Sequence, residues 1–412
     1  MRILVLWRQA DVNIRKTIID HVSCFQRYDV ENEYFYFNIY NGRFAEDYGW
    51  IEESMFDAVI FHYSAIALRG FEGYWEDFLR LMITIWRNYP CKKILIPQDD
   101  YTDTERIWDL ALGIKADIIY TIIRECDHPV LYPKSKLGNI VIKTVLTGYV
   151  EETYIDMLCL KRHRDRKYDV VYRARKLPYE FGRHGQLKYE LSLFFQEQLK
   201  DFDFICDLDN TNDDAGALLG DNWFDFLASS RIVIGCLGGS GLADVTGEYG
   251  RKTRAYMALH SQAAYEEVKA ACFPDAEENL TGMISPRIFD AAITKTCQVL
   301  VGEDYQGILR PDIDYIVLDS SFSNVDAVIE KMQDIEYCEK IANNCYEHVV
   351  TSHSYTYKKF AKRIGHDITR REYVQEPLEN LSKYIEKMCK KNNDVVLKEV
   401  MGKEERRRYA KV

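Results

Sequence analysis

The sequence predicts an α/β protein made of two Rossmann-like domains that face a cleft, followed by C-terminal helices. Short apolar runs alternate with longer amphipathic segments, as in stacked βαβ units. A charged segment interrupts this rhythm before it starts again. The chain has 412 residues, which favours two domains because single cores stop growing at about 250–300 residues.

The N-terminal domain is expected to span residues 1–150. Its strands are β-branched or aromatic without clean alternation, which is typical of a sheet covered on both faces. We expect them at Arg2–Trp7, Glu33–Phe37, Asp57–His62, Lys92–Pro97, Asp117–Thr121 and Ile140–Val145. Helical periodicity fills the intervals near Asn13–Arg27, Phe71–Asn88 and Thr102–Leu112.

Residues 151–167 end in the charged run KRHRDRK and are expected to form a linker. A C-terminal domain is then expected over residues 168–340. Its strands are expected at Tyr168–Tyr172, Asp203–Cys206, Ile232–Gly235, Gln298–Val301 and Tyr315–Leu318. Its helices are expected near Gln186–Lys200, Asn222–Ser229, Arg254–Cys272 and Pro286–Thr294. The remaining residues, 341–412, have a helical pattern and could cross back to the first domain.

Bulk properties narrow the class of protein. The formal net charge of −11 argues against a general nucleic-acid binder, although it allows a local basic pocket. The 11 cysteines form no C-x-x-C pair, which is typical of reduced thiols in a cytoplasmic protein. No apolar run approaches the roughly 18 residues needed to span a bilayer. We therefore expect a soluble, cytoplasmic protein with at most a peripheral membrane contact.

Several common sites are absent from the sequence. The first strand-to-helix turn, WRQADVNIR, has no glycine, which argues against a dehydrogenase. No P-loop, H-E-x-x-H or G-x-S-x-G pattern occurs. Asp207 and Asp209 form a D-x-D, a pattern that some sugar transferases use for Mn²⁺ or Mg²⁺. The same spacing occurs at two further places in this acidic chain, so we expect no metal site and no bound cofactor.

Glycines concentrate in GCLGGSGLADVTGEYG, directly after an apolar strand. Gly238, Gly239, Ser240 and Gly241 are therefore candidates for cradling a phosphate or a sugar, because glycines let backbone amides approach an anion. The alternative is a tight loop that only lets two segments pack.

Cations concentrate in YRARKLPYEFGRHGQLKYE, which follows the first strand of the second domain. The segment holds five cations and one histidine: Arg173, Arg175, Lys176, Arg183, Lys188 and His184. Guanidinium and ammonium groups at a strand end suit a diphosphate, and the helix that follows adds its dipole. The alternative is a solvated charged loop.

The segment ISPRIFDAAITKTCQVLV places Ser285 and Pro286 at the cap and first position of a helix. Asp290 falls in the second turn, followed by small residues that permit close approach. A carboxylate there could accept both hydroxyls of a ribose, or it could be an ordinary surface aspartate. Ser285, Arg287 and Asp290 are the donor-binding candidates of this segment.

Two apolar strands of the first domain end in polar side chains. His62 ends VIFH, and Asp99 and Asp100 follow ILIPQ. Neighbouring strand ends line the ligand-binding edge of an α/β sheet, so these residues are candidates for the general base. The alternative is that His62 bonds backbone and the aspartates cap the next helix.

At these segments the chain resembles the bacterial "glycosyl transferases group 1" proteins of the CgeB-like kind. The resemblance rests on LTGYV, DVVYRARKLPYEFGRHG, the glycine loop, SPRIFDAA and FSNVDAVIEKMQD, with HYS and QDDY in the first domain. It implies a GT-B fold, with the acceptor on the N-terminal domain and a nucleotide-sugar donor on the C-terminal domain.

Carried over residue by residue, the resemblance implies that Arg175 and Lys188 hold the donor diphosphate. It also implies that Asp290 takes the place of the second glutamate of the E-x7-E motif of retaining GT-B enzymes. Two departures stand out. Asp290 is one methylene shorter than the usual glutamate, and Gly282 stands where the first glutamate would be. The stereochemical outcome therefore stays open.

Three functions remain open. The first is a metal-independent glycosyltransferase that acts on a glycan, lipid-linked or protein acceptor, as in polysaccharide biosynthesis. The second is a nucleotide-sugar 2-epimerase or hydrolase on the same scaffold. The third is a nucleotide-sugar-binding protein whose catalytic site has decayed. The sequence does not specify the sugar, the nucleotide, the acceptor or the oligomeric state.

Overall fold

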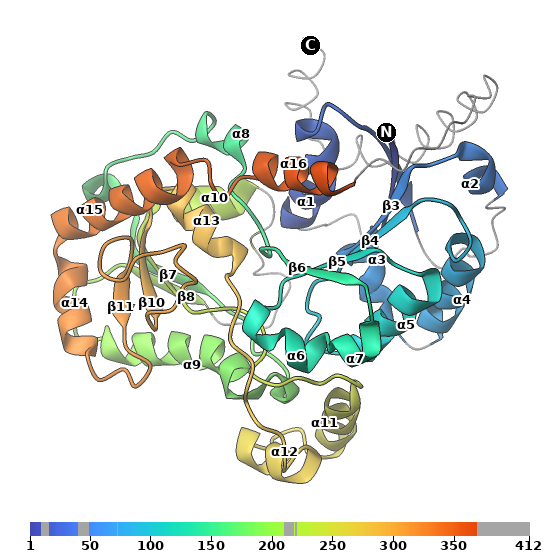
Figure 1. Cartoon of the computed structure of the whole chain (residues 1–412). Coiled ribbons are helices and arrows are strands. Elements are labelled where there is room, and N and C mark those ends of the chain that lie inside the picture. The colour runs from blue at the N-terminus through green and yellow to red at the C-terminus, as the bar shows by residue number, and fades with distance from the viewer. Residues whose placement is uncertain (10–15, 40–48, 72, 210–217, 219–220, 369–412) are drawn as a thin grey trace. The chain divides into compact units, whose positions relative to one another are not determined.

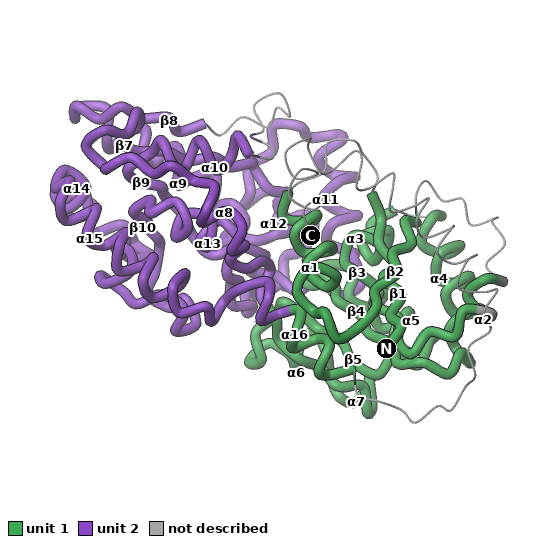
Figure 2. The backbone as a smooth tube through the Cα atoms, turned by 90° about the horizontal axis from the view of Figure 1, so that it is seen from above, with its two compact units in different colours: residues 1–145, 361–412 green, residues 146–360 purple. Residues whose placement is uncertain are grey.

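The computed structural model describes residues 1–9, 16–39, 49–71, 73–209, 218 and 221–368. The chain forms two compact units (Figure 2). Unit 1 comprises residues 1–145 and the chain from Ala361 onward, and unit 2 comprises residues 146–360. None of the described helices is both long and apolar enough to cross a membrane.

Unit 1 is a six-stranded parallel sheet with the strand order β2-β1-β3-β4-β5-β6. The strands are β1 (Arg2–Trp7), β2 (Glu33–Asn38), β3 (Ala58–His62), β4 (Lys92–Ile96), β5 (Ile118–Thr121) and β6 (Val141–Thr144). The larger helices between them are α1 (Lys16–Tyr28), α4 (Tyr74–Trp86) and α5 (Thr104–Ile114). Short helices were not expected: α2 (Gly49–Ser54), α3 (Tyr63–Ile66), α6 (His128–Leu131) and α7 (Lys134–Leu137).

Unit 2 is a five-stranded parallel sheet with the order β11-β10-β9-β7-β8. Its strands are β7 (Tyr168–Arg173), β8 (Cys206–Asp209), β9 (Ser230–Gly235), β10 (Cys297–Val301) and β11 (Ile316–Leu318). Its helices are α8 (Glu152–Ile155), α9 (Gly182–Gln198), α10 (Asp221–Ala228), α11 (Glu248–Leu259), α12 (Tyr265–Cys272), α13 (Pro286–Ile293), α14 (Val325–Gln333) and α15 (Ile335–Cys345). Figure 1 shows α9, α10, α13, α14 and α15 around the sheet, whereas α11 and α12 lie apart from it.

The strands of unit 2 are buried on both faces, and successive residues contact different helices. On β7, Val170 and Tyr172 pack in one cluster with residues of α9, α14 and α15, whereas Val171 packs in another with residues of α10 and α13. Val233 of β9 repeats the pattern by joining Val171. This two-sided burial explains the apolar strand sequences without clean alternation, and the expected α/β class is confirmed.

Both sheets have the same winding. Numbered from its own first strand, each begins with the order 2-1-3-4-5, so the direction of winding reverses between β1 and β3 in unit 1 and between β7 and β9 in unit 2. Doubly wound sheets bind ligands at the carboxyl ends of the strands beside this switch point. In unit 2 the switch point lies between Arg173 and Gly235, where the cationic segment and the glycine loop begin.

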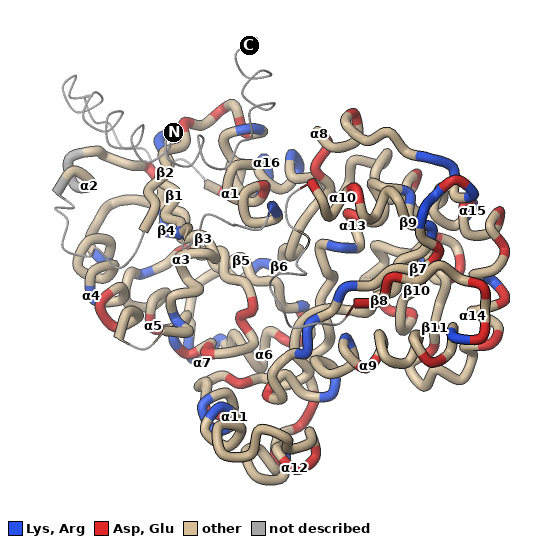
Figure 3. The backbone as a smooth tube through the Cα atoms, turned by 180° about the vertical axis from the view of Figure 1, so that it is seen from behind, with Lys and Arg blue, Asp and Glu red and all other residues tan. Residues whose placement is uncertain are grey.

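Two of the expected elements of unit 2 differ from the structure in position or in number. Strand β8 begins at Cys206 because residues 202–204 form a turn, with the Phe204 amide donating to the Phe202 carbonyl. The helix expected over Arg254–Cys272 is two helices, α11 and α12, and Figure 3 shows mainly basic residues on the first and mainly acidic residues on the second. The chain turns between them because the Ala263 amide donates to the carbonyl of His260.

Residues 151–167, expected to form a linker, belong to unit 2. Arg166 is buried, and its guanidinium donates to the carbonyls of Ser230 and Thr294 and to the Thr296 hydroxyl. Arg166 therefore anchors the charged run to unit 2, because a buried cation needs oxygen partners, while Lys161, Arg162, Arg164, Asp165 and Lys167 are exposed. The chain leaves unit 2 within α16 (Tyr357–Asp367), since residues from Ala361 onward belong to unit 1.

Candidate functional site

The candidate site lies in unit 2, at the carboxyl ends of β7 and β9. After β9 the glycine loop turns sharply, with Gly239 at a φ of +90° that favours glycine. Gly238 exchanges two backbone hydrogen bonds with Met283, and the Gly241 amide donates to the Phe181 carbonyl. Buried Ser240 donates its hydroxyl to the carbonyls of Phe181 and Leu242. The loop is therefore fixed by backbone contacts, and the Ser240 hydroxyl is engaged within it.

Lys188, on α9, lies beside this loop. Its Nζ is 3.9 Å from the position that a methyl group on Gly238 would occupy. Burial raises the pKa of the Cys236 thiol at the end of β9, and the charges of Lys188 and Arg287 oppose that rise. Lys188 and Arg287, both donor-binding candidates, therefore act on the same thiol at the start of the glycine loop, although they are 99 residues apart in sequence.

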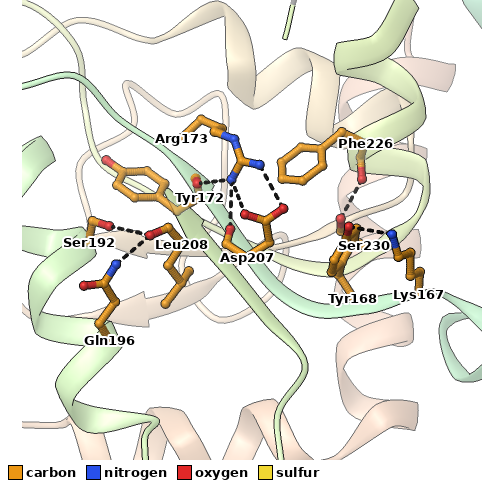
Figure 4. A network of polar contacts seen from close by, with 10 residues as sticks. All are labelled: Lys167, Tyr168, Tyr172, Arg173, Ser192, Gln196, Asp207, Leu208, Phe226 and Ser230. Atoms are coloured by element: carbon orange, nitrogen blue, oxygen red, sulfur yellow. Dashed lines mark hydrogen bonds and ion pairs between the residues drawn. The ribbon is translucent and has the colours of Figure 1, made fainter. Parts of the chain in front are cut away.

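Arg173 forms an ion pair within unit 2. Its two terminal nitrogens donate to both carboxylate oxygens of Asp207, at 2.6 and 2.8 Å (Figure 4). The guanidinium also lies over the Phe226 ring, 4.4 Å from the ring centroid. The bidentate ion pair joins β7 to β8 and neutralises one member of the D-x-D pair. Arg173 therefore has a structural contact that was not expected, since its charge is matched within the protein, and its binding of donor stays a prediction.

The N-terminus of α9, expected to help bind the diphosphate, is occupied by a carboxylate of the protein. Glu278 accepts the amide hydrogens of Arg183 at 2.7 Å and His184 at 3.2 Å, together with the Tyr265 hydroxyl. Arg183 forms ion pairs with Glu190 and Glu266. The helix dipole of α9 is therefore satisfied by Glu278, and Arg183 is engaged at the surface.

Helix α13 carries the third group of candidates. Ser285 takes the N-cap position and Pro286 the first position, as expected, but the Ser285 side chain makes no capping hydrogen bond. Arg287 is exposed and donates to the carbonyl of Arg173. Asp290 is buried and its Oδ2 accepts the indole N–H of Trp223 at 2.9 Å. Asp290 is thus a held carboxylate and not an ordinary surface aspartate.

Gly282 has a steric reason to be glycine. A methyl group there would lie 2.7 Å from Cβ of Leu237 and 2.8 Å from Cε1 of His184. The His184 imidazole donates from Nε2 to the Gly238 carbonyl. Burial lowers the pKa of His184, the hydrogen bond to the Gly238 carbonyl opposes this, and the charge of Lys188 lowers it further. His184 therefore fills the space that a glutamate side chain at position 282 would need.

In unit 1, His62 is fully buried, which argues against the expected catalytic role. Its Nδ1 accepts the Ser64 amide and caps α3, and its Nε2 lies 3.0 Å from Nδ1 of His21. Burial lowers the pKa of His62 well below its usual range, and His21 lowers it further. Both ring nitrogens are engaged, so the alternative of a capping and packing histidine accounts for this residue.

Asp99 and Asp100 follow β4, which pairs with β3 as expected. Asp100 is fully buried, where its Oδ2 accepts the hydroxyls of Thr121 and Tyr132. Burial raises the pKa of Asp100 to about 6, opposed by these two hydrogen bonds. Asp99 is exposed and accepts the Tyr101 hydroxyl at 2.7 Å. Asp99 therefore remains the solvent-facing carboxylate of the three expected catalytic residues.

Two residues of the site were not anticipated from the sequence. Glu278 is exposed and outside every motif, and Trp223 was considered only as part of an expected helix. An aromatic pair at i and i+3, Trp223 and Phe226, was the available signal for a functional helix face. Among the described residues, no group of three or more His, Cys, Asp or Glu is placed to hold a metal ion.

The sequence matches no protein-family model and no curated protein. Solved structures do match. An alpha-glucosyltransferase in complex with UDP and a 13-mer DNA aligns with a TM-score of 0.52 and 10% identity, covering 89% of this chain and 99% of its own. An alpha-glucosyltransferase in complex with UDP-glucose and DNA aligns with a TM-score of 0.51 and 12% identity, covering 90% of this chain and 100% of its own. The chain shares their fold, which confirms the expected GT-B plan of two Rossmann-like domains.

Proposed function

We propose that this chain is a glycosyltransferase that moves a sugar from a nucleotide-sugar donor to a glycan, lipid-linked or protein acceptor. The proposal includes the finer family placement, in the CgeB-like group. The observation that carries it is that Lys188 and Arg287 act at the start of the glycine loop, at the switch point of a doubly wound sheet, and that Trp223 joins Arg287 to Asp290. A sheet of this order binds ligands at that point, and the fold is shared with transferases solved with UDP and UDP-glucose.

Within this proposal the residues have separate roles. Lys188, Arg287 and exposed Arg175 offset the charge that develops on the leaving diphosphate, which is the largest requirement of sugar transfer from a nucleotide. Gly238 and Gly239 let the backbone approach the donor, and Asp290 receives the ribose hydroxyls. Asp99 is the candidate for receiving the acceptor proton, because it is the exposed carboxylate at the end of β4.

One assay tests the function directly. The protein is incubated with UDP-, GDP-, CMP- and TDP-sugars, with and without glycan acceptors, and free nucleotide is measured. A transferase releases nucleotide faster when an acceptor is present. Release at the same rate without an acceptor favours the epimerase or hydrolase, and binding without release favours a decayed site.

The steric filling of position 282 by His184 is the observation that favours the decayed-site alternative. If the first glutamate of the E-x7-E motif is indispensable, a chain that cannot accommodate it binds donor without turning it over. Binding of a nucleotide sugar together with no turnover of any donor in the panel would establish that function.

Metal dependence separates this site from one built on the D-x-D pair. Because Asp207 is paired with Arg173 and the diphosphate is matched by cations, we expect full activity in the presence of EDTA. Activity that EDTA abolishes and Mn²⁺ restores would contradict the proposal.

A further inference from the structure

Helix α10 presents two aromatic rings, and each lies against one guanidinium at the switch point. Cζ of Arg287 is 5.1 Å from the centroid of the Trp223 ring, and Cζ of Arg173 is 4.4 Å from that of Phe226. The two rings are 6.1 Å apart, as expected for residues i and i+3 on one helix face. One helix face therefore supports both arginines.

The two arginines are joined, but they are held differently. Arg287 donates from Nη1 to the backbone carbonyl of Arg173, while the Arg173 side chain is held by the bidentate pair with Asp207. The Phe226 ring therefore contacts an arginine whose side chain is already held by an ion pair. The Trp223 ring contacts Arg287, whose charge reaches the start of the glycine loop.

Trp223 makes a second contact that Phe226 does not make. Its indole N–H donates to Oδ2 of Asp290 at 2.9 Å, and the Asp290 residue is 7% exposed. A carboxylate oxygen can accept more than one hydrogen bond, so this contact orients Asp290 without using up its acceptor capacity. One side chain therefore contacts both Arg287, a donor-binding candidate, and the carboxylate expected at the ribose.

We propose that Trp223 is a positioning residue for the donor nucleotide, holding Asp290 toward the ribose through its N–H and Arg287 toward the diphosphate through its ring. This inference rests on the proposed function. A guanidinium stacked on a ring has fewer accessible orientations, and a carboxylate with one anchored oxygen presents the other in a fixed direction. Nucleotide binding then costs less conformational entropy, because both side chains are already ordered.

Two variants separate the two contacts. Trp223→Phe removes the N–H and keeps a ring, whereas Trp223→Leu removes both. The control is Trp108→Phe in unit 1, which also removes one indole hydrogen bond, from Nε1 to the Leu131 carbonyl at 2.9 Å. The affinities for UDP and GDP are measured first by calorimetry. The nucleotide that binds more tightly is then compared with its 2′-deoxy form and with its monophosphate. Thermal melting of each variant is recorded beside these measurements.

The parent is expected to prefer the ribose form over the 2′-deoxy form. Trp223→Phe should reduce that preference by about 5- to 10-fold, which lies within the range for one ordinary hydrogen bond, and leave the preference for diphosphate over monophosphate intact. Trp223→Leu should reduce both preferences, and Trp108→Phe should change neither.

Three results would overturn the inference, and they can be told apart. A parent protein that binds no nucleoside diphosphate would defeat the proposed function itself. A parent that binds, with Trp223→Phe retaining the full 2′-hydroxyl preference, would defeat the positioning role alone. Loss of cooperative melting in both Trp223 variants would show that the residue acts on stability.

Discussion

Glu180 is a buried carboxyl group behind the glycine loop. It lies in a single turn, Tyr179–Phe181, whose Phe181 carbonyl holds Ser240 and Gly241, and its Oε2 has no partner among the described residues. Burial raises the pKa of Glu180 to about 7, Asp244 raises it further, and its own backbone amide and Arg254 oppose the rise. The protein therefore carries a group that is protonated below neutral pH.

The raised pKa makes the stability of the protein depend on pH. Between the ordinary pKa near 4.5 and the folded value near 7, the folded state binds more protons than the unfolded state. The contribution of protonated Glu180 to the free energy of unfolding is therefore fully present below pH 4.5, and it is lost as the pH rises through 7. Glu180→Gln, which never ionises, should melt above the parent at pH 8 and close to it at pH 5.

The prediction is contradicted if the difference in melting temperature between Glu180→Gln and the parent is the same at pH 5 and pH 8. That result would mean that Glu180 titrates normally in the folded protein. Asp244→Asn is the comparison variant, since both Asp244 oxygens accept backbone amides, from Tyr249 and Gly250, and the substitution should destabilise at either pH.

Position 282 gives a second prediction at the residue scale. Gly282→Ala should destabilise the protein by about 1–3 kcal/mol, because the new methyl group overpacks against Leu237 and His184. His184→Ala empties part of that space, so the double variant should lose less than the sum of the two single losses. Urea unfolding of all four proteins measures this, and strict additivity would show that His184 is not the obstacle.

Residue roles were only partly predictable from the sequence. The sequence identified Arg173 as a candidate donor ligand and His62 as a candidate base, yet each is engaged by a partner that is remote in the chain. Asp207 is 34 residues from Arg173, and His21 is 41 residues from His62. Local patterns show which side chains could bind a ligand, whereas tertiary contacts determine which of them are already engaged.

At the scale of elements, the N-terminus of α9 is capped by Glu278 across 94 residues or more. Glu278→Gln keeps the shape and removes the charge, so we expect a loss of about 1 kcal/mol in the free energy of unfolding. The adjacent exposed Glu277→Gln is the matched control and should be neutral. Equal effects in the two variants would contradict a specific cap at α9.

Elements with strong apolar runs were predictable. Strand β1 has the expected bounds and β4 is one residue shorter than expected, because their cores are β-branched or aliphatic and fully buried. Strand β8 is displaced from its expected place because its sequence, CDLD, is polar and half-buried at the edge of the sheet. There the Arg173 side chain pairs with Asp207 across β7 and β8, a contact that periodicity alone does not show.

For the whole molecule, the alternation of strands and helices predicted two doubly wound α/β units, and the sheet orders confirm it. The repeated order also explains why the candidate donor residues come from separate segments: β7, α9, the glycine loop and α13 all begin or end at one switch point. The exact division of the chain was less predictable, since residues 146–167 pack with unit 2 through buried Arg166 and Glu151.

The central claim is that a nucleoside diphosphate binds at the switch point between β7 and β9. Calorimetry of UDP and GDP with Arg175→Ala and Arg183→Ala tests it most directly, because both arginines lie in the same cationic segment. Arg175→Ala should weaken binding by about 1.5–3 kcal/mol, the range for a charge-assisted hydrogen bond. Arg183→Ala should bind as the parent does, since its guanidinium pairs with Glu190 and Glu266. Parent-like binding by both variants, or an equal loss in both, would contradict the claim.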